Sequence, residues 1–482
     1  MIDYAQPLRD IADPGFTFMN GPGNDLEGVS GQVAAGCNLI IFVTGNGSIT
    51  NFPFVPTLKI TTTTRRHQLL SEEMDINAGR YLDGEPMATL AGAAFDTMVE
   101  AASGKKTQGE RAGHSQVSLW RNWRQTDTTQ LEALRAREAP DGVPFRPARG
   151  GSGRVPTEHV ALILPTSMCS TQVARLAVER LNTKMLGFDK GISRFVTFGH
   201  TEGCGFGGET MYHLLERTYQ GYLTHPNVAA ALLLEHGCEK IPNDVMRRQL
   251  DTAKVPLERY GWVSVQLDGG IEKAIGRIEQ WFATRFADLF LPDEGWSESD
   301  PVALALMTAG PVSDDTAWTL TQIVADVVRS GGSLLLAESD PLFANDLFRN
   351  HLFGEDAPRP SLAYGQPFTQ PGLHVVATET DHWVENLTGF GGCGAQLALT
   401  VVSDHSQQGH PLLPVIQLGE PSQRSRLPAE DIDGFLTGDV AADTAFIQGW
   451  ITAVALGRRK PVANAQGFVD FQLTRGLLGL TT

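Results

Sequence analysis

A glycine-rich stretch in the middle of the chain concentrates side chains that could do chemistry. It reads FGHTEGCGFGG (198–208) and holds His200, Glu202 and Cys204 among five glycines. Imidazole, thiolate and carboxylate groups are ligands for divalent metals, whereas glycines let backbone amides approach an anion at the start of a helix. The stretch therefore allows three interpretations: a metal site, a loop for the carboxylate of a ligand, or a tight turn whose cysteine merely packs.

A second stretch, HGCE (236–239), adds His236, Cys238 and Glu239. Neither stretch has the C-x-x-C or H-E-x-x-H spacing of a local zinc motif. A shared metal site therefore depends on how the fold brings the two stretches together. Dinucleotide binding is disfavoured, because no G-x-G-x-x-G turn directly follows the first strand that we predict in this region.

Further polar residues follow apolar runs near the N-terminus. The turn TGNGS (44–48) offers donors and acceptors that suit a polyhydroxy ligand, although an ordinary polar loop would look the same. In EEMDIN (72–77), Asp75 could act as a base or bind a metal, or the segment could simply end a helix. The candidates for substrate binding are Thr44, Asn46, Ser48, Asn77 and Arg65.

Short apolar runs of the buried-strand type must position these residues. They alternate with stretches of helical periodicity, which predicts βαβ units and an α/β fold with a central, doubly wound, Rossmann-like parallel sheet. Ligands of such sheets bind beyond the carboxyl ends of the strands, where we expect the 198–208 and 236–239 stretches, and Asp314 and Asp315 after the fifth strand. The runs are 160–166, 195–200, 229–237, 262–267, 303–309 and 333–339.

Composition excludes several classes of function. The chain has 482 residues, enough for more than one domain, and a net charge of −17. That charge disfavours binding to nucleic acid or to an anionic membrane surface. No apolar stretch approaches the roughly 20 residues that span a bilayer, and the five cysteines are scattered singly. We therefore expect reduced thiols and a cytoplasmic location.

The two ends of the chain resemble each other. GQVAAGCNLIIFV (31–43) is similar to GFGGCGAQLALTV (389–401), and PFVPTLKI (53–60) is similar to PLLPVIQL (411–418). Matching blocks in the same order indicate an internal duplication, of which only the first copy keeps the TGNGS turn. We therefore predict copy 1 at 1–127, a linker at 128–157, the central domain at 158–350 and a degenerate copy 2 at 351–482, so that two related modules flank the central sheet.

Together these motifs resemble the altronate/galactarate dehydratase family of sugar-acid hydro-lyases, which has a related sulfolactate sulfo-lyase branch. Residues 16–80 resemble the family's C-terminal signature, and GHTEGCG with HGCE resembles its central one. The chain departs from the family in order, because a C-terminal-type module comes first and no SAF-type segment is evident. An Arg–Asn motif is reduced to Arg154, a Cys–Gly–Gly–Ser–Asp turn is reduced to Ser313 and Asp314, and Asn46 replaces an arginine.

The resemblance implies dehydration of a sugar acid to a 2-keto-3-deoxy acid with Fe²⁺ or Mn²⁺. On this basis His200, Cys204, Cys238 and Glu239 are candidate metal ligands, and His200 or Asp75 is the candidate base. The departures favour an alternative, in which a catalytically degenerate member binds a sugar acid or supports a partner. As partners we expect a small-molecule sugar acid and either a second copy of the chain or a complementary subunit with the SAF-like and first central domains.

Overall fold

The computed structural model describes residues 1–10, 15–120, 155–199, 209–289, 291, 296–354, 359–378 and 380–473. Within this part the strands form three sheets, and every pair of neighbouring strands is parallel. The predicted α/β class with parallel sheets is therefore confirmed. None of the described helices is long and apolar enough to cross a membrane.

The middle of the chain forms a four-stranded sheet in the order β5-β4-β6-β7. Its central strand β4 has the sequence VALILP and is buried along its whole length, as expected for a strand with helices on both faces. Its elements are β4 (Val160–Pro165), α6 (Met168–Thr183), β5 (Arg194–Thr197), α7 (Glu209–Leu223), β6 (Val228–Glu235), α8 (Asn243–Thr252), β7 (Tyr260–Ser264) and α9 (Ile271–Ala287).

The C-terminal half forms a separate six-stranded sheet in the order β10-β9-β8-β11-β12-β13. The prediction of one central domain over 158–350 is wrong here, because β8 and β9 belong to this second sheet. The physical reason is pairing: β8 is hydrogen-bonded to β11 along six registered positions, from Leu304–Leu397 to Ala309–Val402. The elements are β8 (Ala303–Ala309), α10 (Asp314–Arg329), β9 (Ser333–Ala337), α11 (Asp346–Phe353), β10 (Gly372–Val376), α12 (Trp383–Cys393), β11 (Leu397–Val402), β12 (Val415–Gly419), β13 (Gly434–Phe435), α13 (Val440–Ala455) and α14 (Val462–Gln466).

The N-terminal module has a three-stranded sheet in the order β1-β2-β3. Helix α1 is capped by the Asn24 side chain and ends at Gly36, whose φ of 116° is the left-handed conformation that glycine tolerates. The elements are α1 (Asp25–Ala35), β1 (Ile40–Thr44), β2 (Thr57–Thr61), α2 (Thr64–Leu69), β3 (Ile76–Asn77), α3 (Met87–Ala102) and α4 (Gln108–Arg111).

This module has the same architecture as the last part of the C-terminal half. Residues from α1 to β3 correspond to residues from α12 to β13 at a constant offset of 358 positions, the separation between Asp75 and Asp433. The strand registers agree, since Ile40 pairs with Thr57 in one module and Ala398 with Val415 in the other. We call the two segments module 1 (25–120) and module 2 (383–473).

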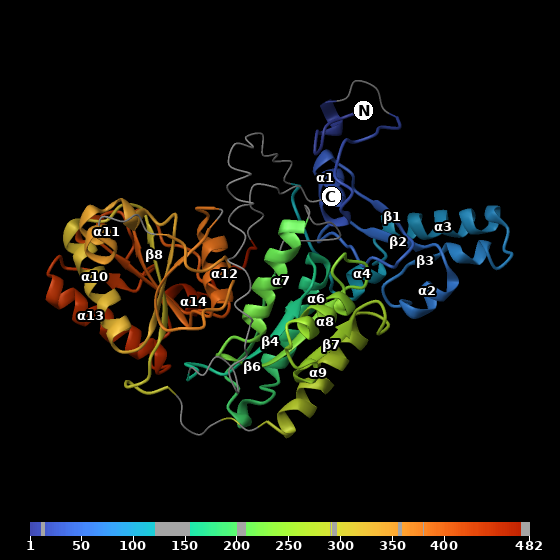
Figure 1. Cartoon of the computed structure of the whole chain (residues 1–482). Coiled ribbons are helices and arrows are strands. Elements are labelled where there is room, and N and C mark those ends of the chain that lie inside the picture. Colours follow the sequence, from blue (N-terminus) through green and yellow to red (C-terminus); the bar gives the residue numbers. More distant parts are fainter. Residues whose placement is uncertain are drawn as a thin grey trace.

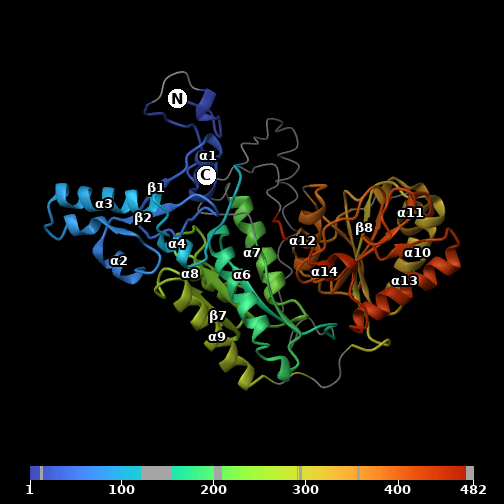
Figure 2. The same cartoon turned by 180° about the vertical axis from the view of Figure 1, so that it is seen from behind.

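The two modules lie against different faces of the middle domain (Figures 1 and 2). Module 1 sits at the carboxyl ends of the four strands, where Leu70 and Met74 join the core around Leu234 and Ile271. Module 2 packs α12 against α7. There the backbones approach so closely that a Cβ atom on Gly221 would lie 1.9 Å from the carbonyl oxygen of Gly392.

Candidate functional site

The strand order of the middle domain places its ligand-binding edge between β4 and β6. The chain runs from β4 to β5 on one side and then crosses back to β6 on the other, so the order reverses between these two strands. Thr166 follows β4 and His236 follows β6, and the Thr166 hydroxyl donates a hydrogen bond of 2.8 Å to Glu239. The HGCE stretch therefore lies at the carboxyl ends of the strands, as predicted. The prediction is wrong for Asp314 and Asp315, because they follow β8 in the other sheet.

Glu239 has a structural role at this edge. One carboxylate oxygen accepts hydrogen bonds from the Thr166 hydroxyl and the His236 amide, and the other accepts from the amides of Gly237 and Cys238, at 2.6–2.9 Å. Two bonds to each oxygen use the lone pairs that a metal ion would need. Glu239 thus shapes the loop in the observed arrangement, and its role as a metal ligand, which stays a prediction, would require it to give up one of these bonds.

His236 and Cys238 are better placed to hold a metal. The ligand atoms of these two residues and of Glu239 lie within 4.8 Å of one another, and Nδ1 of His236 is 3.1 Å from Sγ of Cys238. His236 is fully buried and Cys238 half-buried. An imidazole and a thiolate suit iron or zinc, so the donor set fits a divalent ion once further ligands join it. His200 and Cys204 lie outside the described residues.

Module 1 contributes a buried amine to the same region. Lys59 is in the middle of β2 and is 0% exposed, and its Nζ has no hydrogen-bond partner among the described residues. Burial lowers the pKa of this amine, against the nearby carboxylates of Asp75, Glu73 and Glu110, which raise it. A lowered pKa favours the neutral amine, which is the form that can accept a proton.

His114 and Asn51 adjoin this lysine. Burial, together with the charges of Lys59 and His236, lowers the pKa of His114 to about 3, so the imidazole is neutral at pH 7. Asn51 donates to the carbonyl oxygen of His114 at 2.9 Å, while its Oδ1 and Nδ1 of His114 have no partners among the described residues. Buried polar atoms without partners are rare in folded proteins. Lys59, Asn51, His114 and His236 form what we call the Lys59 cluster.

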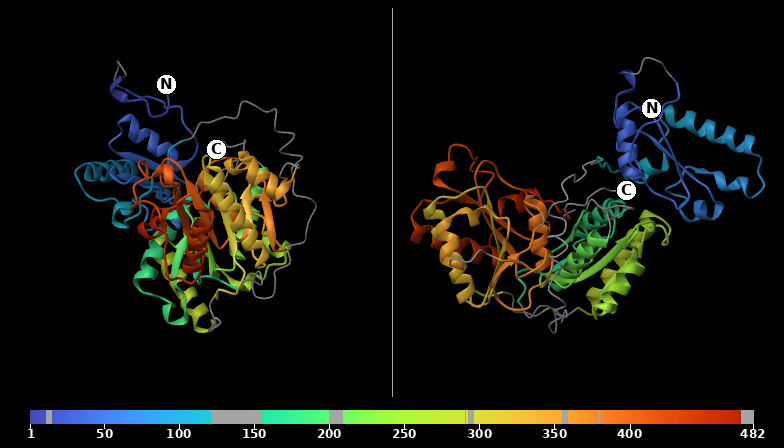
Figure 3. Two further views of the ribbon diagram at one scale, coloured as in Figure 1. Left: turned by 90° about the vertical axis from the view of Figure 1, so that its left-hand side faces the viewer. Right: turned by 45° about the horizontal axis from the view of Figure 1, so that its top comes forward.

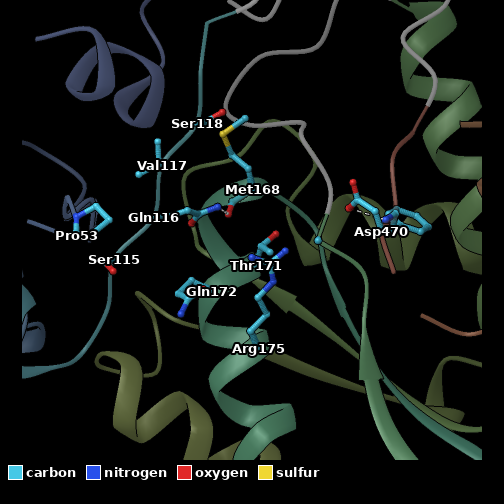
Figure 4. Close-up of a pocket in the computed structure, with 12 residues that line it drawn as sticks. Pro53, Ser115, Gln116, Val117, Ser118, Met168, Thr171, Gln172, Arg175 and Asp470 are labelled. Carbon is cyan, nitrogen blue, oxygen red and sulfur yellow. Dashed lines mark hydrogen bonds between the residues drawn. The ribbon is translucent and has the colours of Figure 1, made fainter. Parts of the chain in front are cut away.

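A cavity of about 300 Å³ is lined by residues that follow His114 in module 1, although none of its lining residues belongs to the Lys59 cluster. It opens between module 1, the start of α6 and the C-terminal end of module 2, and Figure 4 shows its lining. Ser115 is adjacent in sequence to His114, and Gly199 is adjacent to His200. Arg175, Ser115, Ser118 and Thr171 line it, together with the acidic Asp470. One cationic side chain and several hydroxyl groups suit a small, hydroxylated ligand.

The predicted substrate-binding residues are not gathered in this cavity. Thr44 is buried, and its hydroxyl accepts hydrogen bonds from the amides of Gly47 and Ser48, so it holds the turn together. The Ser48 hydroxyl is 2.9 Å from that of Thr50. Asn77 bonds to Thr64, whereas Asn46 and Arg65 are exposed.

Asp75, predicted as a candidate base, has a structural role as well. Its carboxylate oxygens accept hydrogen bonds from the amides of Lys59 and Gln108, each 2.8 Å long. Asp433 does the same in module 2, where it accepts from Gln417 and Val462. Because both modules keep the arrangement, it serves the fold that they share.

Lys59, His114, Asn51 and Arg175 were not among the residues predicted from the sequence. Lys59 had a signal that could have been used, since it stands alone as a charged residue within the strand TLKIT. His114 and Arg175 carry no such signal, because only the packing of module 1 on the middle domain reveals their surroundings.

Comparisons with known proteins agree with this division of the chain. The family model described as D-galactarate/altronate dehydratase, C-terminal, matches residues 1–125. The model described as D-galactarate dehydratase/altronate hydrolase, second domain, matches residues 149–288. Together the two models cover more than half of the chain.

Three curated relatives match over shorter stretches. Altronate dehydratase of Escherichia coli K12 is 34% identical over 122 residues, which are 25% of this chain and 24% of that protein. Galactarate dehydratase (L-threo-forming) of the same organism is 32% identical over 123 residues, 25% of this chain and 24% of that protein. The beta subunit of (2R)-sulfolactate sulfo-lyase from Chromohalobacter salexigens is 28% identical over 109 residues, 22% of this chain and 28% of that protein. The matched part thus spans only about a quarter of each relative.

Proposed function

The chain belongs to the altronate/galactarate dehydratase family, and we propose that it is a lyase that removes water from a sugar acid to give a 2-keto-3-deoxy acid. The observation that carries this proposal is the Lys59 cluster, which lies where the strand order of the middle domain reverses. A buried amine with a lowered pKa and a neutral imidazole form an environment for proton transfer, and Ser115, the residue after His114, lines the cavity.

The proposed reaction begins with removal of the proton next to the carboxylate of the substrate. That proton is weakly acidic, so the reaction needs a base and a stabiliser for the negative charge that develops. We assign Lys59 as the base, in place of Asp75, whose oxygens are bound to backbone amides. Arg175 would bind the carboxylate of the substrate, and the hydroxyls of the cavity would bind its hydroxyl groups.

The departing hydroxyl needs a proton donor. His200 keeps its place as a candidate for this role or for metal binding, because it follows Gly199 at the cavity wall. His236 and Cys238 would hold a divalent ion such as Fe²⁺ or Mn²⁺, which supplies a Lewis acid for the carboxylate when it is bound.

A binding or supporting role is the second candidate function. The departures from the family's motifs favour it, since Arg154, Ser313 and Asp314 are what remain of two of these motifs and Asn46 replaces an arginine. In that case the chain alone would bind a sugar acid at the cavity without turning it over.

An activity assay tests the proposal directly. The protein is purified without oxygen, reconstituted with Fe²⁺ or Mn²⁺, and offered a panel of aldonates and aldarates, with keto-acid formation as the readout. We expect turnover of at least one acid and loss of turnover in Lys59→Gln.

Metal content and ligand binding separate the two candidate functions. The matched control is Gln417→Met, which changes the residue of module 2 at the position equivalent to Lys59. Retained metal and binding of a sugar acid without turnover would favour the supporting role. Neither binding nor turnover with any acid of the panel would contradict both candidates.

A further inference from the structure

Equivalent segments of the two modules line the cavity described above. The middle domain lies between module 1 and the C-terminal half (Figure 1 and the right-hand view of Figure 3). In module 1 the amide of Gln116 donates to the carbonyl oxygen of Asn51. In module 2 the amide of Asp470 donates to the carbonyl oxygen of Gly409, which is the equivalent of Asn51. Gln116 and Asp470 therefore occupy the same place in the two modules, and both line the cavity.

The two equivalent positions differ in charge. The Gln116 side chain donates a hydrogen bond of 2.7 Å to the carbonyl oxygen of Met168, so this residue joins module 1 to the start of α6. Asp470 carries a carboxylate at that place. Because module 1 folds with a neutral residue there, the backbone that the modules share does not require an acid.

The carboxylate of Asp470 is held in position at the wall of the cavity. One of its oxygens accepts a hydrogen bond of 2.8 Å from the amide of Phe471. Phe471 is 1% exposed, and its ring is stacked on that of Phe198 with the centroids 4.6 Å apart. Phe198 directly precedes Gly199, which is another lining residue. The negative charge therefore has a defined place beside any bound ligand.

Arg175 of α6 supplies the opposite charge. Among the residues that the structure describes, Arg175 and Asp470 are the charged side chains that line the cavity, and neither forms an ion pair with another described residue. The guanidinium lies against the backbone of Gly199, where a Cβ atom would be 2.7 Å from Nη2. Figure 4 shows Asp470 on the opposite side of Thr171 from the residues of module 1. The cavity thus offers one cation and one anion at separate places.

We propose that Asp470 is a specificity-determining residue, through which module 2 makes the cavity accept an aldonate and reject an aldarate. The inference rests on the proposed function, since it assumes that this cavity binds the sugar acid. An aldonate has one carboxylate, which pairs with Arg175, and Asp470 accepts a hydrogen bond from a hydroxyl group at its other end. An aldarate has a carboxylate at each end, and the second one is repelled by Asp470.

The size of the cavity makes this selection effective. Its volume of about 300 Å³ is at the small end of the range for ligand sites. A six-carbon acid that contacts Arg175 therefore cannot keep its other end far from Asp470. An aldarate gains nothing by turning round, because both of its ends are charged.

Binding of matched acids tests the role of Asp470. The pairs are altronate with altrarate, galactonate with galactarate, and gluconate with glucarate, in each of which the acids differ only at C6. Isothermal titration calorimetry uses the full chain carrying Lys59→Gln, so that turnover does not interfere, reconstituted with Mn²⁺. We expect this parent chain to bind the aldonate of a pair at least about 10-fold more tightly than the aldarate.

Two charge-removing variants of this parent chain supply the comparison. Asp470→Asn keeps an oxygen for the Phe471 amide, and Asp470→Gln introduces the residue of module 1. Each should reduce the preference to about threefold or less by tightening the aldarate. The matched control is Asp404→Asn, which removes the same charge from an exposed position of module 2 outside the cavity lining and should leave the preference unchanged. Thermal unfolding verifies that every variant is folded.

The outcomes separate this inference from the proposed function. Equal affinity for the two acids of a pair, tighter binding of the aldarate, or a preference that both Asp470 variants leave unchanged would each overturn the inference. Binding of no acid would overturn the inference and the proposed function together. Selective binding of an aldonate that Asp470→Asn abolishes, in a protein whose wild type shows no turnover, would support the inference and favour the supporting role over the lyase.

Discussion

Module 1 and module 2 share a backbone and differ in what surrounds it. Both keep the register of the first two strands and the aspartate that ties three segments together. Module 2 is covered on both sides and has lost the polar cluster: Gln417 stands in place of Lys59, and Phe468 in place of His114. Module 1 has the cluster, and no strand of the described residues pairs with the second edge of its β1. The comparison shows that this backbone arrangement does not depend on the polar residues of the Lys59 cluster.

The fate of the buried amine is the clearest difference. The Gln417 side chain donates a hydrogen bond of 2.6 Å to the carbonyl oxygen of Gln407 and accepts one of 2.7 Å from the backbone amide of Gln407. Both polar atoms of this side chain therefore have partners within module 2. Within the described part of the chain, Nζ of Lys59 has no such partner. Burying an unpaired polar group destabilises a protein, and residues that break this rule are expected at functional sites.

Replacing Lys59 by the glutamine of module 2 should have the largest effect. Lys59→Gln is expected to reduce turnover by about 10²–10⁴-fold, the range for loss of a general base, while the thermal unfolding temperature stays the same or rises. Steady-state kinetics and differential scanning calorimetry measure the two effects. Turnover within twofold of the wild type would remove Lys59 from the mechanism.

A lysine substitution at equivalent positions of β1 and β11 should change the free energy of unfolding by different amounts. Leu399 of β11 is 0% exposed, whereas Ile41 of β1 is 52% exposed. Leu399→Lys buries a charge in a core position and should lower the free energy of unfolding by about 4 kcal/mol, whereas Ile41→Lys should change it by less than about 0.5 kcal/mol. Urea denaturation of each single variant measures the difference. Equal losses would mean that β1 is covered in the isolated chain, contrary to the structure.

His114 should make stability depend on pH. Its folded-state pKa of about 3 lies below the usual value of 6.5, so the unfolded state binds the extra proton between these values and stability falls as the pH falls. From pH 7 to pH 5 this amounts to about 2 kcal/mol. His114→Phe, the residue of module 2, should remove this part of the pH dependence.

Urea denaturation at several pH values, with metal removed by a chelator, provides the comparison for His114. The difference between wild type and variant isolates this one residue from the other titrating groups. Parallel stability curves for the two proteins would show that His114 is not buried in its neutral form.

The smallest effects are expected at the aspartate that both modules keep. Asp75→Asn and Asp433→Asn should each lower the free energy of unfolding by about 1–2 kcal/mol, because a weaker acceptor replaces the carboxylate that bonds two amides. Turnover of Asp75→Asn, corrected for the folded fraction, should be unchanged. A specific loss of turnover would restore Asp75 as the base.

The sequence predicted those features that depend on local pattern. Buried strands such as VALILP, the α/β class and the likeness of the two ends follow from periodicity and from matching blocks. The assignment of β8 failed because an apolar strand does not encode its neighbour: ALALMTA suits either sheet equally well. The sequence predicted that HGCE follows a strand of the middle sheet, as it does after β6. The Lys59 cluster comes from residues far apart in the sequence that only the packing of module 1 brings together.

The contact between Gly221 and Gly392 explains why a module without the Lys59 cluster persists. Leu387 and Phe390 of α12 share one core with Leu215 and Tyr219 of α7, and the backbones meet where Gly221 cannot carry a side chain. A chain without module 2 would expose this core to solvent. Selection for a folded middle domain therefore preserves module 2 even without the residues of the Lys59 cluster. The residue equivalent to Lys59 could therefore change while the contact with α7 was kept, and natural variants of this chain should keep a glycine at position 221.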